Sequence, residues 1–171
     1  MSQRWLRLRA DRAGARGAVA VEFALVLPLL LALLVGTMTA GLGYNKILGV
    51  SDGVHEGARF GATTEISGSW GSTVQQQTMA LTYLNLPGKV PVVTSSMVCA
   101  QLVRAPSTVV QASSCGLATT APSSPTGVVA GTCLVKVWAE IPVTFDLVVL
   151  GSFDTTVKRQ SVALYERGSC V

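Results

Sequence analysis

The chain has 171 residues, of which 49% are hydrophobic and only 13% are charged, a balance that favours one membrane segment joined to one modest domain. The formal net charge of +4 does not describe the whole protein, because the excess lies entirely in residues 1–17. Those residues contain five arginines and one aspartate while the rest contains eight basic and eight acidic residues, which excludes a basic surface spread over the molecule.

Residues 1–17 form a basic leader directly before an apolar segment. Positively charged residues beside a membrane helix stay on the cytoplasmic side, so we expect the N-terminus inside the cell and the remainder outside. The alternative is an arm that binds nucleic acid. Trp5 is its sole aromatic residue and the leader adjoins a membrane segment, so we predict no nucleic-acid partner.

The apolar segment, residues 18–44, is predicted to be a transmembrane helix. From Phe23 to Tyr44 it contains no charged side chain, and a helix of that length is roughly 33 Å long, enough to cross a bilayer. One acid, Glu22, stands at its front edge, five residues after Gly17. An ordinary signal peptide has no acid at this position.

The sequence RGAVAVEFALVLPLLL at this boundary, with HEGARFGA further along, resembles the TadE-like family, the minor pilins or pseudopilins of bacterial tight-adherence (Flp) pili. The resemblance covers residues 17–62 closely and residues 134–167 loosely. It implies that a prepilin peptidase cuts between Gly17 and Ala18.

By the same resemblance, Glu22 becomes the fifth residue of the mature chain and acts in assembly together with Phe23. The Ala18 amine of one subunit then pairs with the Glu22 carboxylate of another. An unpaired carboxylate at the edge of hydrocarbon costs about 2.5 kcal/mol or more. The alternative is an acid that only reaches out to interfacial water.

Residues 45–66 are predicted to extend the same helix outside the membrane, so that one helix runs from about Val19 to Ala62. Apolar residues recur there at helical spacing, at Ile47, Val50, Val54 and Ala58. Glycines recur at every fourth position, at Gly49, Gly53, Gly57 and Gly61. We interpret the glycine row as a helix-packing surface; the alternative is a helix weakened by about 1 kcal/mol per glycine.

Residues 67–171 are predicted to be an extracytoplasmic α+β domain. Ser72 and Gln75 have capping-box spacing, which predicts a second helix that ends at Pro87-Gly88. Its inner stripe is expected to contain Val74, Thr78, Leu81 and Leu84.

Strands are expected at residues 90–104 and 108–112, with a surface loop at residues 113–131 that is rich in Ser, Thr, Gly and Pro. Alternation is clearest from Val135 to Val143, where apolar positions alternate with Lys136, Trp138 and Glu140. A last strand at about residues 154–167 completes an antiparallel hairpin, which gives a small antiparallel sheet packed on the outer helix.

The four cysteines all follow the membrane segment, and an even number in an exported domain favours disulfides over a metal site. Three pairings are possible. The hairpin brings Cys133 near Cys170, which leaves Cys99 with Cys115.

The sequence contains no enzyme constellation, since His55 is the only histidine, and it indicates no cofactor and no metal. We expect a non-enzymatic minor pilin or pseudopilin in the bacterial cytoplasmic membrane, single-pass, with pilins and pilus-assembly proteins as partners; entry into the fibre stays open. One alternative is an uncleaved, signal-anchored envelope protein that binds something outside. Another is a secreted domain released near Ala40.

Overall fold

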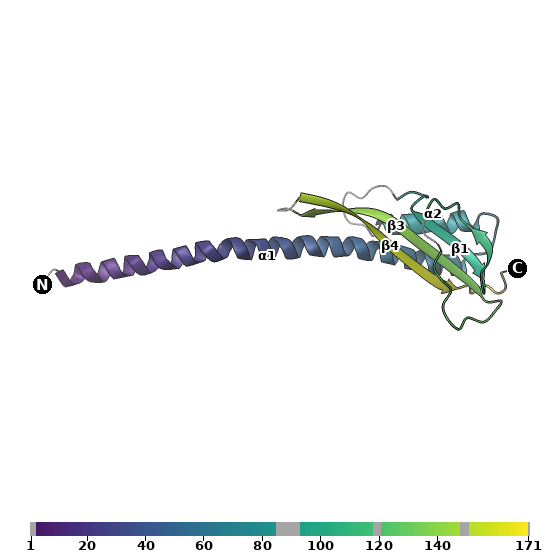
Figure 1. The fold of residues 1–171 in the computed structure, drawn as a ribbon, viewed down its shortest axis with the longest axis horizontal. Coiled ribbons are helices and arrows are strands. Elements are labelled where there is room, and N and C mark those ends of the chain that lie inside the picture. The colour runs from purple at the N-terminus through teal and green to yellow at the C-terminus, as the bar shows by residue number, and fades with distance from the viewer. Residues whose placement is uncertain (1–2, 85–92, 118–120, 148–150, 171) are drawn as a thin grey trace. The chain divides into compact units, whose positions relative to one another are not determined.

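The computed structural model describes residues 3–84, 93–117, 121–147 and 151–170. Within these residues there are two helices and four strands (Figure 1), in the order α1 (Gln3–Thr63), α2 (Trp70–Leu84), β1 (Val98–Arg104), β2 (Thr108–Ala112), β3 (Cys133–Leu147) and β4 (Gly151–Leu164). The predicted α+β class, with a long N-terminal helix, a short second helix and an antiparallel sheet, is confirmed.

The chain forms two compact units, Met1–Ala40 and Gly41–Val171. Residues 45–66, predicted as the outer extension of the helix, lie in the same compact unit as residues 67–171. The helix itself is longer than predicted, because α1 begins at Gln3 and not near Val19. The leader is rich in Arg, Leu and Ala, which are strong helix formers, and it contains no proline.

The end of α1 is held by partners from other elements. The last carbonyls of a helix have no partner within it, and here Trp70 Nε1 donates to the Gly61 oxygen at 3.2 Å while the Glu166 amide donates to the Ala62 oxygen at 3.0 Å. The Tyr165 hydroxyl donates to the Thr64 oxygen at 3.2 Å, just past the helix end. The second helix and the chain after β4 thus supply hydrogen-bond donors to backbone oxygens at the C-terminal end of α1.

The start of α2 differs from the prediction. The helix begins at Trp70, and the Ser69 oxygen accepts the Thr73 amide at 2.9 Å, so the capping box expected at Ser72 and Gln75 is wrong. The Ser72 hydroxyl instead donates to the Ser69 oxygen at 2.8 Å. The Gln75 side chain is buried and points toward the strands. Its amide group donates to a strand carbonyl oxygen, that of Val98, and not to the start of its own helix.

The inner stripe of α2 is partly as expected. Val74 and Thr78 are buried, but Thr82 is buried where Leu81 was expected, and Leu81 is only half-buried. The α2 helix ends at Leu84, and the predicted stop at Pro87-Gly88 lies outside the described residues.

The sheet has the strand order β2-β1-β3-β4 and every neighbouring pair is antiparallel. β1 is shorter than predicted, because residues 95–97 form a turn before it, and β2 has the predicted bounds. β3 and β4 form the expected hairpin, with Leu147 paired to Gly151. Gly151 has φ +87°, a conformation that favours glycine.

The core lies between one face of the sheet and both helices. Alternate β3 residues from Val135 to Val143 are buried there, and they form one cluster with residues of α1 and α2: Val50, Val54, Ala58, Ala62, Trp70 and Val74. In Figure 1, α2 and the C-terminal part of α1 lie on the same side of the strands.

The opposite face of β3 is also covered, which the alternation did not predict. Lys136 and Trp138 are only 7% and 5% exposed. Lys136 Nζ donates to the Pro122 oxygen at 2.7 Å, so the segment expected as a surface loop lies against the sheet. The described residues of that segment form neither helix nor strand.

Candidate functional site

The residues predicted for cleavage and assembly lie on α1 in the first compact unit. Gly17 is helical and exposed, and a Cβ added there would have nothing within 4 Å. Glu22 is exposed, and Phe23 is 59% exposed. This part of the chain therefore presents a small residue and an acid directly before an apolar run.

The apolar run after Glu22 is unusual in its exposure. Leu25 is 75% exposed and Leu34 is 63% exposed, and most of the large apolar side chains between them are exposed as well. Removing apolar surface from water stabilises a protein by about 25 cal/mol per Å². In a water-soluble protein such side chains would therefore be buried against other elements. The helix is long and apolar enough to cross a membrane, since an 18-residue window within it has a mean hydropathy of 2.6, and this suggests a membrane anchor.

Two residues of the predicted glycine row, Gly53 and Gly57, lie where α1 meets α2. A Cβ at Gly57 would stand 2.8 Å from Thr78 Cβ, and one at Gly53 would stand 2.7 Å from Thr82 Cα. Gly61 lies under the Trp70 ring, where an added Cβ would be 3.2 Å from Cζ2. Gly49 is buried as well. The two helices are thus close enough at Gly53 and Gly57 that a larger residue would force them to shift.

The single histidine connects α1 to β4. His55 Nδ1 lies 3.2 Å from Ser161 Oγ. Ser161 is only 8% exposed and its hydroxyl points at the helix, whereas the His55 side chain is exposed. The pair is a packing contact between helix and sheet. Sequence reasoning missed it because the two residues are 106 positions apart.

The four cysteines form two disulfides, Cys99–Cys115 and Cys133–Cys170. These are the same pairs that the hairpin predicts. Among the residues that the structure describes, no group of three His, Cys, Asp or Glu side chains lies close enough to hold a metal ion.

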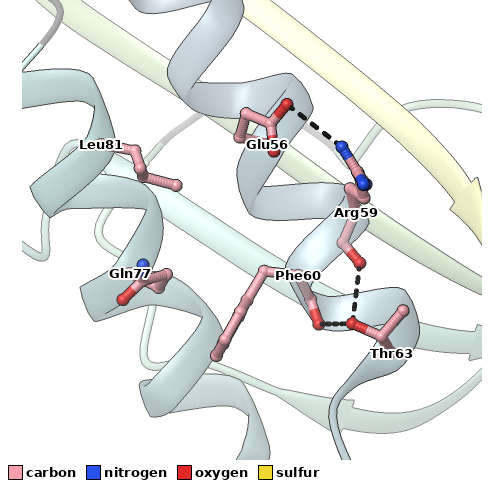
Figure 2. A pocket seen from close by; sticks show the side chains of 6 residues that line it. All are labelled: Glu56, Arg59, Phe60, Thr63, Gln77 and Leu81. Carbon is pink, nitrogen blue, oxygen red and sulfur yellow. Dashed lines mark hydrogen bonds and ion pairs between the residues drawn. The ribbon is translucent and has the colours of Figure 1, made fainter.

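An open pocket of about 280 Å³ lies between α1 and α2, on the side away from the sheet (Figure 2). Glu56, Arg59, Phe60 and Thr63 line it from α1, and Gln77 and Leu81 line it from α2. Glu56 and Arg59 approach to 3.8 Å, but both side chains are exposed, so this ion pair contributes little to stability. Its shape and mixed polarity point to no particular ligand.

One buried cation lies on the outer face of the sheet. Burial lowers the pKa of Lys136 from its usual 10.5, because the desolvated ammonium is unfavourable. Its hydrogen bond to Pro122 holds the covering segment against β3. The sequence offered no signal for this, since the position reads as an exposed strand residue.

The family model described as TadE-like protein matches residues 17–59. The matched residues run from the predicted cleavage glycine, through Glu22 and the apolar run, to Arg59 on the outer part of α1. The resemblance identified from the sequence is confirmed over that segment, and it associates the chain with Tad pilus systems and with a membrane. No curated protein and no solved structure matches the chain.

Proposed function

We propose that this chain is a minor pilin or pseudopilin that takes part in assembling a tight-adherence pilus and catalyses no reaction. The observation that carries the proposal is the family match at residues 17–59. That match combines the spacing of Gly17 and Glu22 with a helix long and apolar enough to cross a membrane. Neither feature alone is specific, but the two together are typical of pilin-like subunits.

A prepilin peptidase is the first proposed partner. A peptidase binds its substrate in an extended form, so the helix must unwind around the bond between Gly17 and Ala18 before it is cut. Glycine costs a helix about 1 kcal/mol relative to alanine, which eases this unwinding. The free space around Gly17 leaves the bond accessible.

Glu22 is the proposed assembly residue, next to Phe23. Cleavage creates a new amine at Ala18, and its positive charge can pair with the exposed Glu22 carboxylate of a neighbouring subunit. Such a pair removes the cost of leaving a carboxylate beside hydrocarbon. This ion pair stabilises the contact between two subunits, but it does not stabilise the insertion of a single subunit into the membrane.

The charge distribution supports one orientation. Five arginines in residues 1–17 favour a cytoplasmic leader, and the residues after Tyr44 are then outside the cytoplasmic membrane. Two disulfides fit an oxidising compartment. That domain is the part that meets other pilins, assembly proteins or, if adhesion is involved, an external surface.

Cleavage is tested by N-terminal sequencing of the protein from cells that contain the cognate peptidase. We expect the mature protein to begin at Ala18 and the Gly17→Val variant to stay uncut, because the valine side chain blocks the bond. Gly14→Val is the matched control and should be cut normally. A wild-type N-terminus at Met1 or Ser2 would favour the uncleaved anchor, and one at Gly41 would favour a released domain.

The assembly role is tested with Glu22→Gln, which keeps size and hydrogen bonding but removes the charge. We expect the variant to insert and to be cut, whereas its crosslinking to other pilus components and piliation fall at matched expression. A plain anchor would tolerate the change, since removing an acid beside hydrocarbon favours insertion. Full piliation by an inserted and processed Glu22→Gln variant would contradict the proposed role.

A further inference from the structure

The β3–β4 hairpin reaches the part of α1 where the uncharged segment ends. Phe145 packs on Gly43, so closely that a Cβ added to Gly43 would collide with the ring. Lys46 Nζ donates a hydrogen bond of 2.7 Å to the Thr144 oxygen. Gly43 is next to last in the predicted membrane segment, residues 18–44, and lies three positions before Lys46, the first charged residue after Glu22. A bilayer crossed by that segment would have its outer surface at the level of Phe145.

Aromatic rings gather at this level. Phe145 and Phe153 are directly paired across the two strands, and their rings stack with centroids 5.1 Å apart. Phe153 is 50% exposed, and Tyr44 on α1 is 61% exposed. Together they are three of the ten aromatic residues in the chain. Exposed rings are unfavourable in water, whereas tyrosine is enriched at membrane interfaces and phenylalanine occurs on the apolar face of segments that lie at the boundary between headgroups and acyl chains.

The charged groups nearby suit an interface and not the hydrocarbon. Lys46 is half-buried and bonded to Thr144, and the Asp154 carboxylate accepts the Thr144 hydroxyl at 2.6 Å. The sequence that joins the two phenylalanines, DLVVLGS, has one charged residue, Asp146. A charge near the membrane interface costs about 0–1 kcal/mol, far less than at the bilayer centre.

We propose that the Phe145, Phe153 and Tyr44 side chains rest in the headgroup region of the outer leaflet, so that a lipid surface covers them. The hairpin is then a second attachment of the chain to the bilayer that α1 crosses. The inference rests on the membrane anchoring within the proposed function, and it is independent of cleavage at Gly17 and of pilus assembly.

The test uses nitroxide labels on the full chain in bilayer nanodiscs of phosphatidylcholine and phosphatidylglycerol. All four native cysteines are in disulfides, so one added cysteine is the only free thiol. Labels are placed by Phe153→Cys and by Ser152→Cys, which keeps both rings in place. The matched control is Leu164→Cys, because Leu164 is 59% exposed on the same strand and pairs with Leu134, far from Phe145. Collisions with oxygen, which enters lipid, and with a water-soluble nickel chelate report the depth of each label.

We expect the ratio of oxygen to nickel accessibility to be severalfold higher at positions 152 and 153 than at 164. Equal ratios at the three positions would overturn the proposal. Protection of position 153 from both reagents would also overturn it, because a protein surface such as a second copy would then cover the hairpin.

A label introduced by Leu31→Cys, in the middle of the apolar run, separates two kinds of failure. A lipid-immersed label at position 31 with a water-exposed label at 153 overturns the hairpin proposal alone. If the label at position 31 is as accessible to nickel as the label at position 164, α1 does not cross the membrane. That result would overturn both the hairpin proposal and the proposed function.

Discussion

A single methyl group at Gly57 is enough to disturb the contact between α1 and α2. An added Cβ would stand 2.8 Å from Thr78 Cβ and 2.9 Å from Cγ2. Thr78 cannot turn away freely, because its hydroxyl donates to the Val74 oxygen at 2.7 Å inside the buried interface. The glycine is therefore required by close packing and not by an unusual backbone conformation.

We predict that Gly57→Ala lowers the free energy of unfolding by about 1–2 kcal/mol. Alanine gains about 1 kcal/mol of helix propensity, but overpacking a core costs about 1–3 kcal/mol or more, and the rigid partner favours the upper end. Gly41→Ala is the control, since a Cβ there has nothing within 4 Å. The measurement is urea unfolding of the full chain in micelles, and equal stability of the two variants would refute the packing role.

Lys136 makes stability depend on pH in the alkaline range. Burial lowers its pKa below 10.5, so the folded state binds the proton less tightly than the unfolded state does. The contribution of Lys136 to stability is therefore least favourable at pH values below the folded-state pKa and improves as pH rises from there toward 10.5.

We predict that the wild type gains unfolding free energy relative to Lys136→Met as pH rises from neutral toward the usual lysine pKa of 10.5. Methionine has similar length but no charge and cannot bind Pro122. Unfolding curves of both proteins at several pH values check this. A difference that does not change with pH would show that the ammonium is not desolvated in the folded state.

Among the elements, α2 is hydrogen-bonded to the chain around β1 and β2 through the Gln75 side chain. Gln75 is 3% exposed, and its Nε2 lies 2.7–2.9 Å from three carbonyl oxygens, those of Ser95, Val98 and Ser114. The amide has two hydrogens for three acceptors, so they share it. These acceptors lie before β1, in β1 and after β2, and Gln75 holds all three segments beside the helix.

We predict that Gln75→Met destabilises the protein by about 1–3 kcal/mol, because buried carbonyl oxygens lose their donor. Gln76→Met is the matched control on the same helix, where the side chain is exposed, and it should be near neutral. Thermal unfolding of the two variants is the measurement. A Gln76 variant as destabilised as the Gln75 variant would mean that the effect is one of helix composition.

At the scale of the whole molecule, two disulfides close loops of different length. Cys99 and Cys115 are 16 residues apart, and Cys133 and Cys170 are 37 residues apart. The longer loop ties the C-terminal segment to the first residue of β3. In the chain-entropy account a longer loop restricts the unfolded chain more.

We predict that replacing both Cys133 and Cys170 by alanine costs about 0.7 kcal/mol more than replacing both Cys99 and Cys115, from the ratio of loop lengths. Peptide mapping without reduction should also show both links in protein taken from the cell envelope. The reverse order of stability would contradict the entropic account, and a Cys99–Cys133 link would contradict the strand register.

Much of the architecture depends on local features and was therefore predictable. The uncharged run from Phe23 to Tyr44 predicts a spanning helix from length alone. Alternation along Val135–Val143 identified β3, and a short connection to the next strand implied an antiparallel hairpin. The hairpin in turn placed Cys133 near Cys170. The block around Gly17 and Glu22 carries the family resemblance in its sequence alone.

The contacts between distant segments were decided only by tertiary packing. The pattern around Gln75 suggested a helix cap, but the side chain finds stronger partners 20 to 39 residues away. Lys136 reads as an exposed strand residue, yet the segment containing Pro122 covers it. The stacking of Phe145 on Phe153 and the fit of Phe145 to Gly43 also depend on which face each strand presents. Periodicity determines that a face is buried, but only the folded chain determines what buries it, because the covering residues lie far away in the sequence.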